Sequence, residues 1–176
     1  LVMGFAAVPE PAIDAALDLK AQGKLVGEVT VSTYRDALVF CDRPEPASVI
    51  DAKFSLQHAV AVVMEHGAPQ LADFEPDAIA ALAEARARVQ VVESPAFTHA
   101  YPAHFGAAVA SASGQVTLSD ARGDPERPLP ENGVIEKARA LMDWGGLDSA
   151  QADAMIAAVL EGDSLADIRR LMEEWL

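Results

Sequence analysis

The chain has 176 residues, 51% of them hydrophobic and 23% charged, which suffices for one sizeable core and argues against disorder. Acidic residues outnumber basic ones by 27 to 13, giving a formal net charge of -14. This charge repels phosphate backbones, so we expect no nucleic-acid partner. The apolar stretch from Ala59 to Met64 is too short to cross a membrane, which needs about 18 apolar residues, so we expect no membrane span.

The first half of the chain predicts a helix, a strand and a second helix. A helical pattern runs from about Pro11 to Gln22, with proline at its start and Gly23 at its end. Residues 25–33 then alternate between two sets and are rich in β-branched types, which predicts a half-buried strand. After an irregular loop at 42–46, Ser55 to His66 predicts a core helix that Gly67 ends.

The second half predicts one more helix, two further strand regions and a helical end. Asp77 to Arg86 follows Pro76 as a helix, and Val89 to Val92 is a short strand. Residues 106–118 predict a strand or a hairpin broken at Ser113-Gly114, before a polar surface loop from Asp120 to Pro130. The last third predicts helices at 134–142, 149–160 and 164–176.

These elements indicate an α+β fold with a small, mainly antiparallel sheet covered by several helices. The chain lacks both a regular βαβ rhythm and a glycine-rich turn after a strand, which argues against a doubly wound sheet. We expect one domain over residues 1–176. The apolar stripe of the last helix predicts that it docks on this domain's own core, and Trp144 and Trp175 are expected to be core or interface anchors.

Cysteine and histidine usage gives no sign of a metal or a cofactor. The single cysteine, Cys41, has no partner for an internal disulfide, and it is expected to be a small buried thiol rather than a nucleophile. The four histidines lack a close-spaced ligand pattern. Residues 1–7 lack the basic start of a signal peptide, so the cytoplasm is the expected location.

The segment DAKFSLQHAVAVVMEHG, residues 51–67, resembles the signature of the MmgE/PrpD family. A helix before VGEVTV, a VQVV strand, the Tyr101-Pro102 pair and an EKARALM helix follow the family's order, so the resemblance covers nearly the whole chain. It implies the smaller α+β C-terminal domain of a longer, two-domain chain. In such proteins the active site lies in the cleft beside a large helical N-terminal domain.

The resemblance implies two main catalytic residues, Lys53 and His58, which match active-site positions of the family. Tyr101 is a weaker catalytic candidate, and His104, three residues further on, is a candidate substrate contact. Members commonly have a Lys-x-Tyr-Pro stretch and a histidine before the first helix, where this chain has Leu1, Met3 and Glu10. At the N-terminal edge of the site the chain therefore departs from the family's pattern.

The residues themselves allow an anion site at the start of the helix that begins near Ser55. If Ser55 caps that helix, free backbone N–H groups of its first turn would receive a carboxylate, which makes Ser55 a substrate-binding candidate. Lys53 would hold the carboxylate or a developing enolate, and His58 would transfer a proton. Without the resemblance, such a lysine is commonly solvated, and His58, Tyr101 and His104 are commonly structural or surface residues.

The family acts on small polycarboxylates without a metal, which implies a lyase of the 2-methylcitrate dehydratase type. Epimerase activity of the iminodisuccinate type and decarboxylase activity of the cis-aconitate type share the proton-abstraction step and are the near alternatives. A different alternative is a non-catalytic lid or assembly module. Family members usually form homodimers, so the resemblance also implies a dimer.

Overall fold

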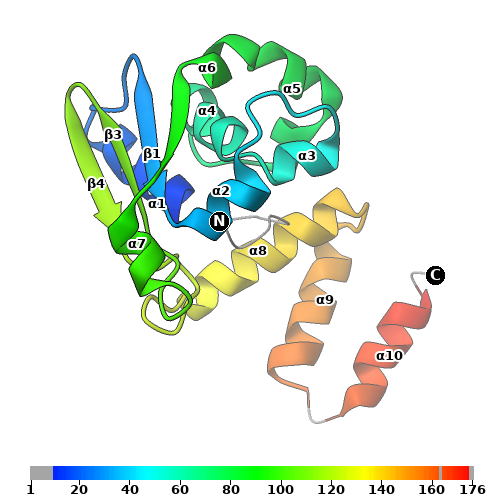
Figure 1. Ribbon diagram of the computed structural model, residues 1–176. Coiled ribbons are helices and arrows are strands. Elements are labelled where there is room, and N and C mark those ends of the chain that lie inside the picture. The colour runs from blue at the N-terminus through cyan, green and yellow to red at the C-terminus, as the bar shows by residue number, and fades with distance from the viewer. Residues whose placement is uncertain (1–9, 163, 175–176) are drawn as a thin grey trace. The chain divides into compact units, whose positions relative to one another are not determined.

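The computed structural model describes residues 10–162 and 164–174, which fall into two compact units. The first, here called the sheet unit, comprises residues 10–129, and the second, the helical unit, comprises the described residues from 130 onward. Figure 1 labels the elements of both. The predicted α+β class is confirmed, and no described helix is long and apolar enough to span a membrane.

The sheet unit is built on four strands in the order β2-β1-β3-β4. β1 pairs in parallel with β2, from Val29 opposite Val89 to Thr33 opposite Glu93. The other two pairings, β1 with β3 and β3 with β4, are antiparallel, so the sheet is mixed. The strands are β1 (Val29–Thr33), β2 (Val89–Glu93), β3 (Ala107–Ser111) and β4 (Gly114–Leu118).

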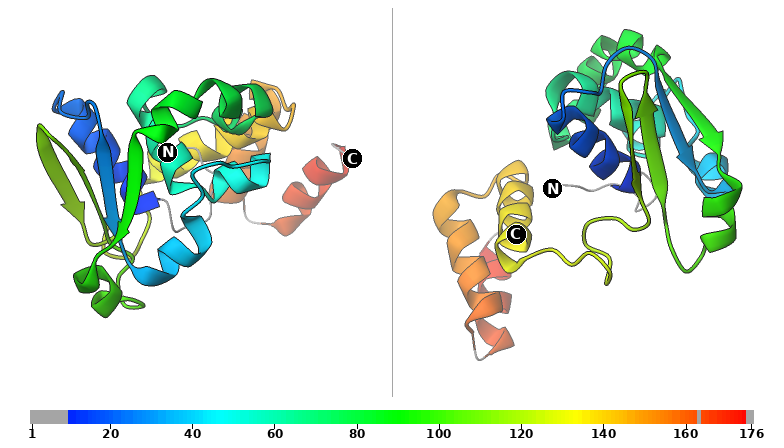
Figure 2. Two further views of the ribbon diagram at one scale, coloured as in Figure 1. Left: turned by 45° about the horizontal axis from the view of Figure 1, so that its top comes forward. Right: turned by 90° about the vertical axis from the view of Figure 1, so that its left-hand side faces the viewer.

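Two helices cover one face of this sheet: α1 (Glu10–Ala21) packs on β3 and β4, and α4 (Leu56–His66) packs on β2. Figure 2 shows both helices on the same side of the strands. Alternate residues of β1 are buried against this layer, as expected for a sheet with one covered face. The core therefore lies between the sheet and the α1–α4 pair.

The parallel pairing of β1 with β2 requires a long connection, because parallel neighbours cannot be joined by a tight turn. That connection holds the short helices around α4, and after β2 one more helix precedes β3. These elements are α2 (Arg35–Cys41), α3 (Val49–Lys53), the 3-10 turn η1 (Leu71–Phe74), α5 (Pro76–Ala81), α6 (Ala83–Ala87) and α7 (Pro95–Ala100).

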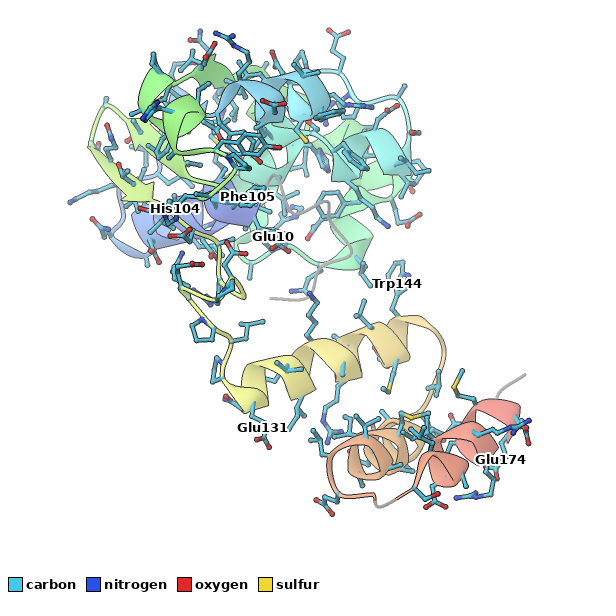
Figure 3. All side chains as sticks on the ribbon, turned by 60° about the horizontal axis from the view of Figure 1, so that its bottom comes forward. Glu10, His104, Phe105, Glu131, Trp144 and Glu174 are labelled. Carbon is cyan, nitrogen blue, oxygen red and sulfur yellow. The ribbon has the colours of Figure 1, made fainter. Side chains whose placement is uncertain are left out.

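The helical unit consists of α8 (Glu131–Trp144), α9 (Ser149–Leu160) and α10 (Leu165–Glu174). α9 contacts both α8 and α10, so α10 packs on α9 within this unit. The side chain of Trp144 is 54% exposed and points away from α9 in Figure 3. Trp175 lies outside the described residues.

Several predicted boundaries differ from the observed ones for identifiable reasons. β1 begins at Val29 instead of residue 25, because Gly27 has a φ of 68° that interrupts the extended backbone. The helix predicted over 77–86 is two helices that meet at Leu82. Residues 106–118 form the hairpin rather than a single strand.

Candidate functional site

Lys53 is the last residue of α3 and is partly exposed. Within the described part of the sheet unit, no hydrogen bond or ion pair engages its ammonium group. This is unusual here, since every other cationic side chain of residues 10–129 has a polar partner. Those side chains are Lys20, Lys24, Arg35, Arg43, Arg86, Arg88, Arg122 and Arg127. Lys53 is therefore available to bind an anion.

Ser55 is the N-cap of α4, as the sequence predicted. Its hydroxyl accepts from the backbone N–H of His58 at 2.9 Å and donates to the carbonyl of Arg43 at 2.6 Å. The side chain is fully buried. The hydroxyl thus both donates and accepts a hydrogen bond within the protein. These two bonds join α4 to the segment after α2.

His58 is also fully buried, and both of its ring nitrogens have protein partners. Nδ1 lies 3.3 Å from Nη1 of Arg86, and Nε2 lies 2.8 Å from the carbonyl oxygen of Asp73. Because a guanidinium only donates, Nδ1 must accept and Nε2 must carry the hydrogen that Asp73 accepts. Burial lowers the pKa of His58, an effect that the Arg86 charge reinforces and the Asp73 carbonyl opposes. The imidazole is therefore neutral and held in one tautomer.

The segment between α2 and α4 is fixed by side chains on both of its sides. Arg43 forms an ion pair with Asp51 of α3, and its guanidinium lies over the Phe54 ring, 5.7 Å from the centroid. Gln57 of α4 bonds through its amide to the Asp42 carboxylate and to the backbone N–H of Arg43. These contacts hold the end of α3, and with it the backbone of Lys53, in place.

Tyr101 lies at the other end of α2 from Lys53, where the chain leaves α7. Its ring stacks on Tyr34, with centroids 4.7 Å apart and an interplanar angle of 9°. Phe105 meets both rings edge-on. Since Tyr34 directly precedes α2, the stacked tyrosines lie at the start of this helix, and α2 lies between α7 and α3 in Figure 1.

His104 follows Tyr101 and is paired with Asp120: its Nδ1 lies 2.8 Å from Oδ1 of Asp120. The hydrogen bond and charge of Asp120 raise the pKa of His104. The pair borders a shallow depression of about 330 Å³ walled by residues of α7 and the end of β4. Figure 3 labels His104 beside Phe105, in the segment that joins α7 to β3.

The loop that carries Asp120 is anchored by a buried carboxylate. Asp14 of α1 is 1% exposed; its Oδ2 accepts from the backbone N–H of Arg122 at 2.8 Å and from Nη1 of Arg127 at 3.4 Å. The same Nη1 donates to the backbone carbonyl of Asp120 at 2.8 Å. The loop that carries Asp120 is thereby tied to α1.

The structure thus places the predicted residues in two groups: Lys53, Ser55 and His58 at the α3–α4 junction, and Tyr101 and His104 beyond the other end of α2. The sequence analysis missed three contributors, Tyr34, Arg86 and Asp120. Each is distant in sequence from the residue that it contacts, so no local motif could reveal it. Within the described residues, no three histidine, cysteine or acidic side chains gather as metal ligands.

Comparison with known proteins assigns the chain to a family. A search of curated proteins found no match. Residues 7–162 match the sequence profile of the MmgE/PrpD C-terminal domain, which is most of the chain. The sheet unit and most of the helical unit fall within this range. The chain therefore belongs to the MmgE/PrpD family and corresponds to its C-terminal domain.

Proposed function

We propose that this domain contributes half of the active site of a lyase that acts on a small polycarboxylate, most closely resembling 2-methylcitrate dehydratase. The observation that carries the proposal is Lys53, a partly exposed ammonium group without a described polar partner, in the KFSLQH segment within the range that matches the family model. In a protein with a net charge of -14, a cation left unpaired is suited to an anionic ligand.

In this proposal Lys53 binds a substrate carboxylate. When a base removes the proton on the adjacent carbon, negative charge spreads onto that carboxylate, and the Lys53 ammonium stabilises it. The electron pair then forms the carbon–carbon double bond as the neighbouring hydroxyl leaves with a proton as water. The base comes from the helical N-terminal domain of the same protein. Tyr101 supplies a hydrogen-bond donor.

We assign His58 a positioning role in this site. A general base needs a free lone pair within reach of the substrate, whereas the Nδ1 lone pair of His58 faces Arg86 and the side chain is sealed from solvent. His58 instead holds the first turn of α4, which adjoins Lys53. His104 stays a candidate substrate contact, with its Nε2 facing away from Asp120.

The test is an assay of the full-length protein with 2-methylcitrate, citrate, cis-aconitate and iminodisuccinate. Lys53→Met keeps the length of the side chain and removes its charge, so we expect kcat/KM to fall by about 100-fold or more. Lys24→Met is the matched control, because Lys24 is an exposed lysine of the same unit whose ammonium group donates to the exposed side chain of Gln22. Equal activity of the two variants would reject the role of Lys53.

The substrate panel also separates the alternatives within the family. Turnover of cis-aconitate with release of carbon dioxide would identify a decarboxylase, and inversion of iminodisuccinate would identify an epimerase. A full-length protein that binds the inert tricarboxylate propane-1,2,3-tricarboxylate without turning over any of the four compounds would be a lid or assembly module. We further propose that the protein is cytoplasmic and forms a homodimer. The mass of the native particle tests whether it is a dimer.

A further inference from the structure

The imidazole of His104 has one nitrogen bonded and one free. Its Nδ1 lies 2.8 Å from Oδ1 of Asp120, and its Nε2 makes no hydrogen bond to any described residue. The two ring nitrogens point in different directions, so the bond to Asp120 turns Nε2 away from the carboxylate. The side chain of His104 is 46% exposed, whereas that of Asp120 is 11% exposed. The residue with the free nitrogen is therefore the open member of the pair.

The pair borders a depression of about 330 Å³. This volume lies at the lower end of the range for small-molecule sites, about 300–1,000 Å³. α7 contributes only apolar side chains to the wall, and the polar lining residues are His104, Ser119 and Asp120. Apolar walls strengthen the electrostatic interactions of a charged group beside them. An ionisable pair at the edge of a small, partly apolar hollow is an arrangement that acid–base catalysis uses.

Asp120 determines the chemistry that His104 can perform. Its carboxylate accepts from Nδ1, so a proton exchanged with a ligand passes through Nε2. The hydrogen bond and then the charge of Asp120 raise the pKa of His104; partial desolvation opposes the rise, and the charge of Glu126 adds to it. The guanidinium of Arg127 bonds to the backbone carbonyl of Asp120 and leaves its carboxylate to the imidazole. The protonated form of His104, which donates from Nε2, is thereby favoured.

Both members of the pair are fixed by the protein. The backbone N–H of His104 donates to the carbonyl of Ala100 at 3.1 Å, which ties the residue to the end of α7. On the other side, Arg127 connects the backbone of Asp120 to the buried carboxylate of Asp14. A donor that is held in place before the reaction needs no reorganisation while charge develops.

We propose that His104, paired with Asp120, is the general acid of the dehydration. Its Nε2 donates a proton to the substrate hydroxyl; the carbon–oxygen bond breaks with its electron pair passing to oxygen, and water leaves as the double bond forms. The base of the N-terminal domain takes the proton from the neighbouring carbon, and His104 recovers its own proton from solvent. This inference rests on the proposed function and identifies the source of the proton that the leaving hydroxyl needs.

The test measures kcat/KM of the full-length protein against pH, with a compound that the wild type dehydrates. Because only the protonated imidazole is active, kcat/KM should fall on the alkaline side, with the pKa that NMR titration gives for His104. Asp120→Asn lowers that pKa, so this fall should move to lower pH. His104→Gln should lower kcat/KM by about 100- to 10,000-fold and abolish this pH dependence. Urea midpoints check that each variant is folded.

His99→Gln is the matched control, since His99 is exposed on α7 and does not line the depression. If the wild type dehydrates 2-methylcitrate or citrate and His104→Gln matches the control, the general acid is rejected while the proposed function stands. The same holds if Asp120→Asn leaves the alkaline fall in place, or if it moves a fall on the acidic side, which would make His104 a base.

The substrate panel separates this failure from that of the proposed function. If the wild type turns over none of the four compounds, the proposed function fails and the general acid with it. Turnover by decarboxylation or epimerisation alone also overturns the general acid, because neither reaction releases a hydroxyl.

Discussion

The imidazole of His58 donates through Nε2 to the carbonyl oxygen of Asp73 at 2.8 Å, although the two residues are 15 positions apart. On its other side, Nδ1 accepts from Arg86 of α6. One buried ring therefore connects α4 with η1 and α6, and it also meets the Phe74 ring edge-on at 5.1 Å. His58 therefore links the helices that support Lys53.

Replacement of His58 by alanine should destabilise the protein. The variant leaves a cavity, removes the partner of the buried Asp73 carbonyl and takes one acceptor from Arg86, so we expect a loss of about 2–4 kcal/mol in the free energy of unfolding. Urea titration followed by circular dichroism measures it. His99→Ala is the control, because His99 is exposed and should change stability by less than about 0.5 kcal/mol. Similar losses in both variants would contradict the bonding role of His58.

The lowered pKa of His58 predicts a loss of stability on the acid side. As pH falls below 6.5, the ordinary value for histidine, this residue takes up a proton in the unfolded chain but stays neutral in the fold. The unfolded state is then favoured until the pH reaches the lowered pKa of the folded state. Above 6.5 the residue is neutral in both states and contributes no pH dependence.

Comparison with His58→Gln isolates this contribution from those of other histidines. The difference in unfolding free energy between the wild type and the variant should shrink as pH falls from roughly 7 to 5. Urea titrations at several pH values measure the difference. A gap of constant size over that range would show that the pKa of His58 is not lowered by folding.

Local signals in the sequence account for much of the fold. Pro11 and Gly23 mark the first helix correctly to within two residues, and Ser55 and Gly67 bound α4 as predicted, because caps act through adjacent backbone groups. The short helices α2, α3 and α7 were not predicted. Each has five to seven residues, too few for a helical periodicity to emerge.

Less of the candidate site than of the fold could be predicted from the sequence. The KFSLQH segment pointed to Lys53 and His58, but their different environments depend on tertiary contacts. His58 is sealed because Arg86 and Asp73 come from elements more than 14 residues away, whereas Lys53 finds no described partner. The parallel pairing of β1 with β2 was missed for the same reason, since strand direction depends on how the long connection folds.

The cap at Ser55 should contribute more to stability than the cap at Ser48. Ser55→Ala loses the N-cap of α4 and the bond to the Arg43 carbonyl, both in a buried place, so we expect a loss of about 1–3 kcal/mol. Ser48→Ala removes an exposed cap from the five-residue α3 and should cost about 0.5–1 kcal/mol. Urea unfolding of both variants gives the comparison. If Ser48→Ala were the more damaging change, α3 rather than α4 would anchor this junction.

The pKa of His104 should depend on the carboxylate of Asp120. Asp120→Asn removes the carboxylate whose hydrogen bond and charge raise the pKa of His104, so that pKa should fall toward 6.5. NMR titration of the imidazole protons measures the shift. Asp77→Asn removes an exposed carboxylate from the first turn of α5 and should leave the titration of His104 unchanged.

The raised pKa of His104 also sets the direction of its effect on stability. The folded protein binds this proton more tightly than the unfolded chain does, so the stabilisation is complete below pH 6.5 and is lost as pH rises through the folded value. Asp14→Ala should weaken the same effect from a distance, because Asp14 secures Arg127, which bonds to the Asp120 backbone. If Asp14→Ala lowered stability but left the pKa of His104 at its wild-type value, the pair would be independent of that support, and Asp14 would serve only to anchor the loop.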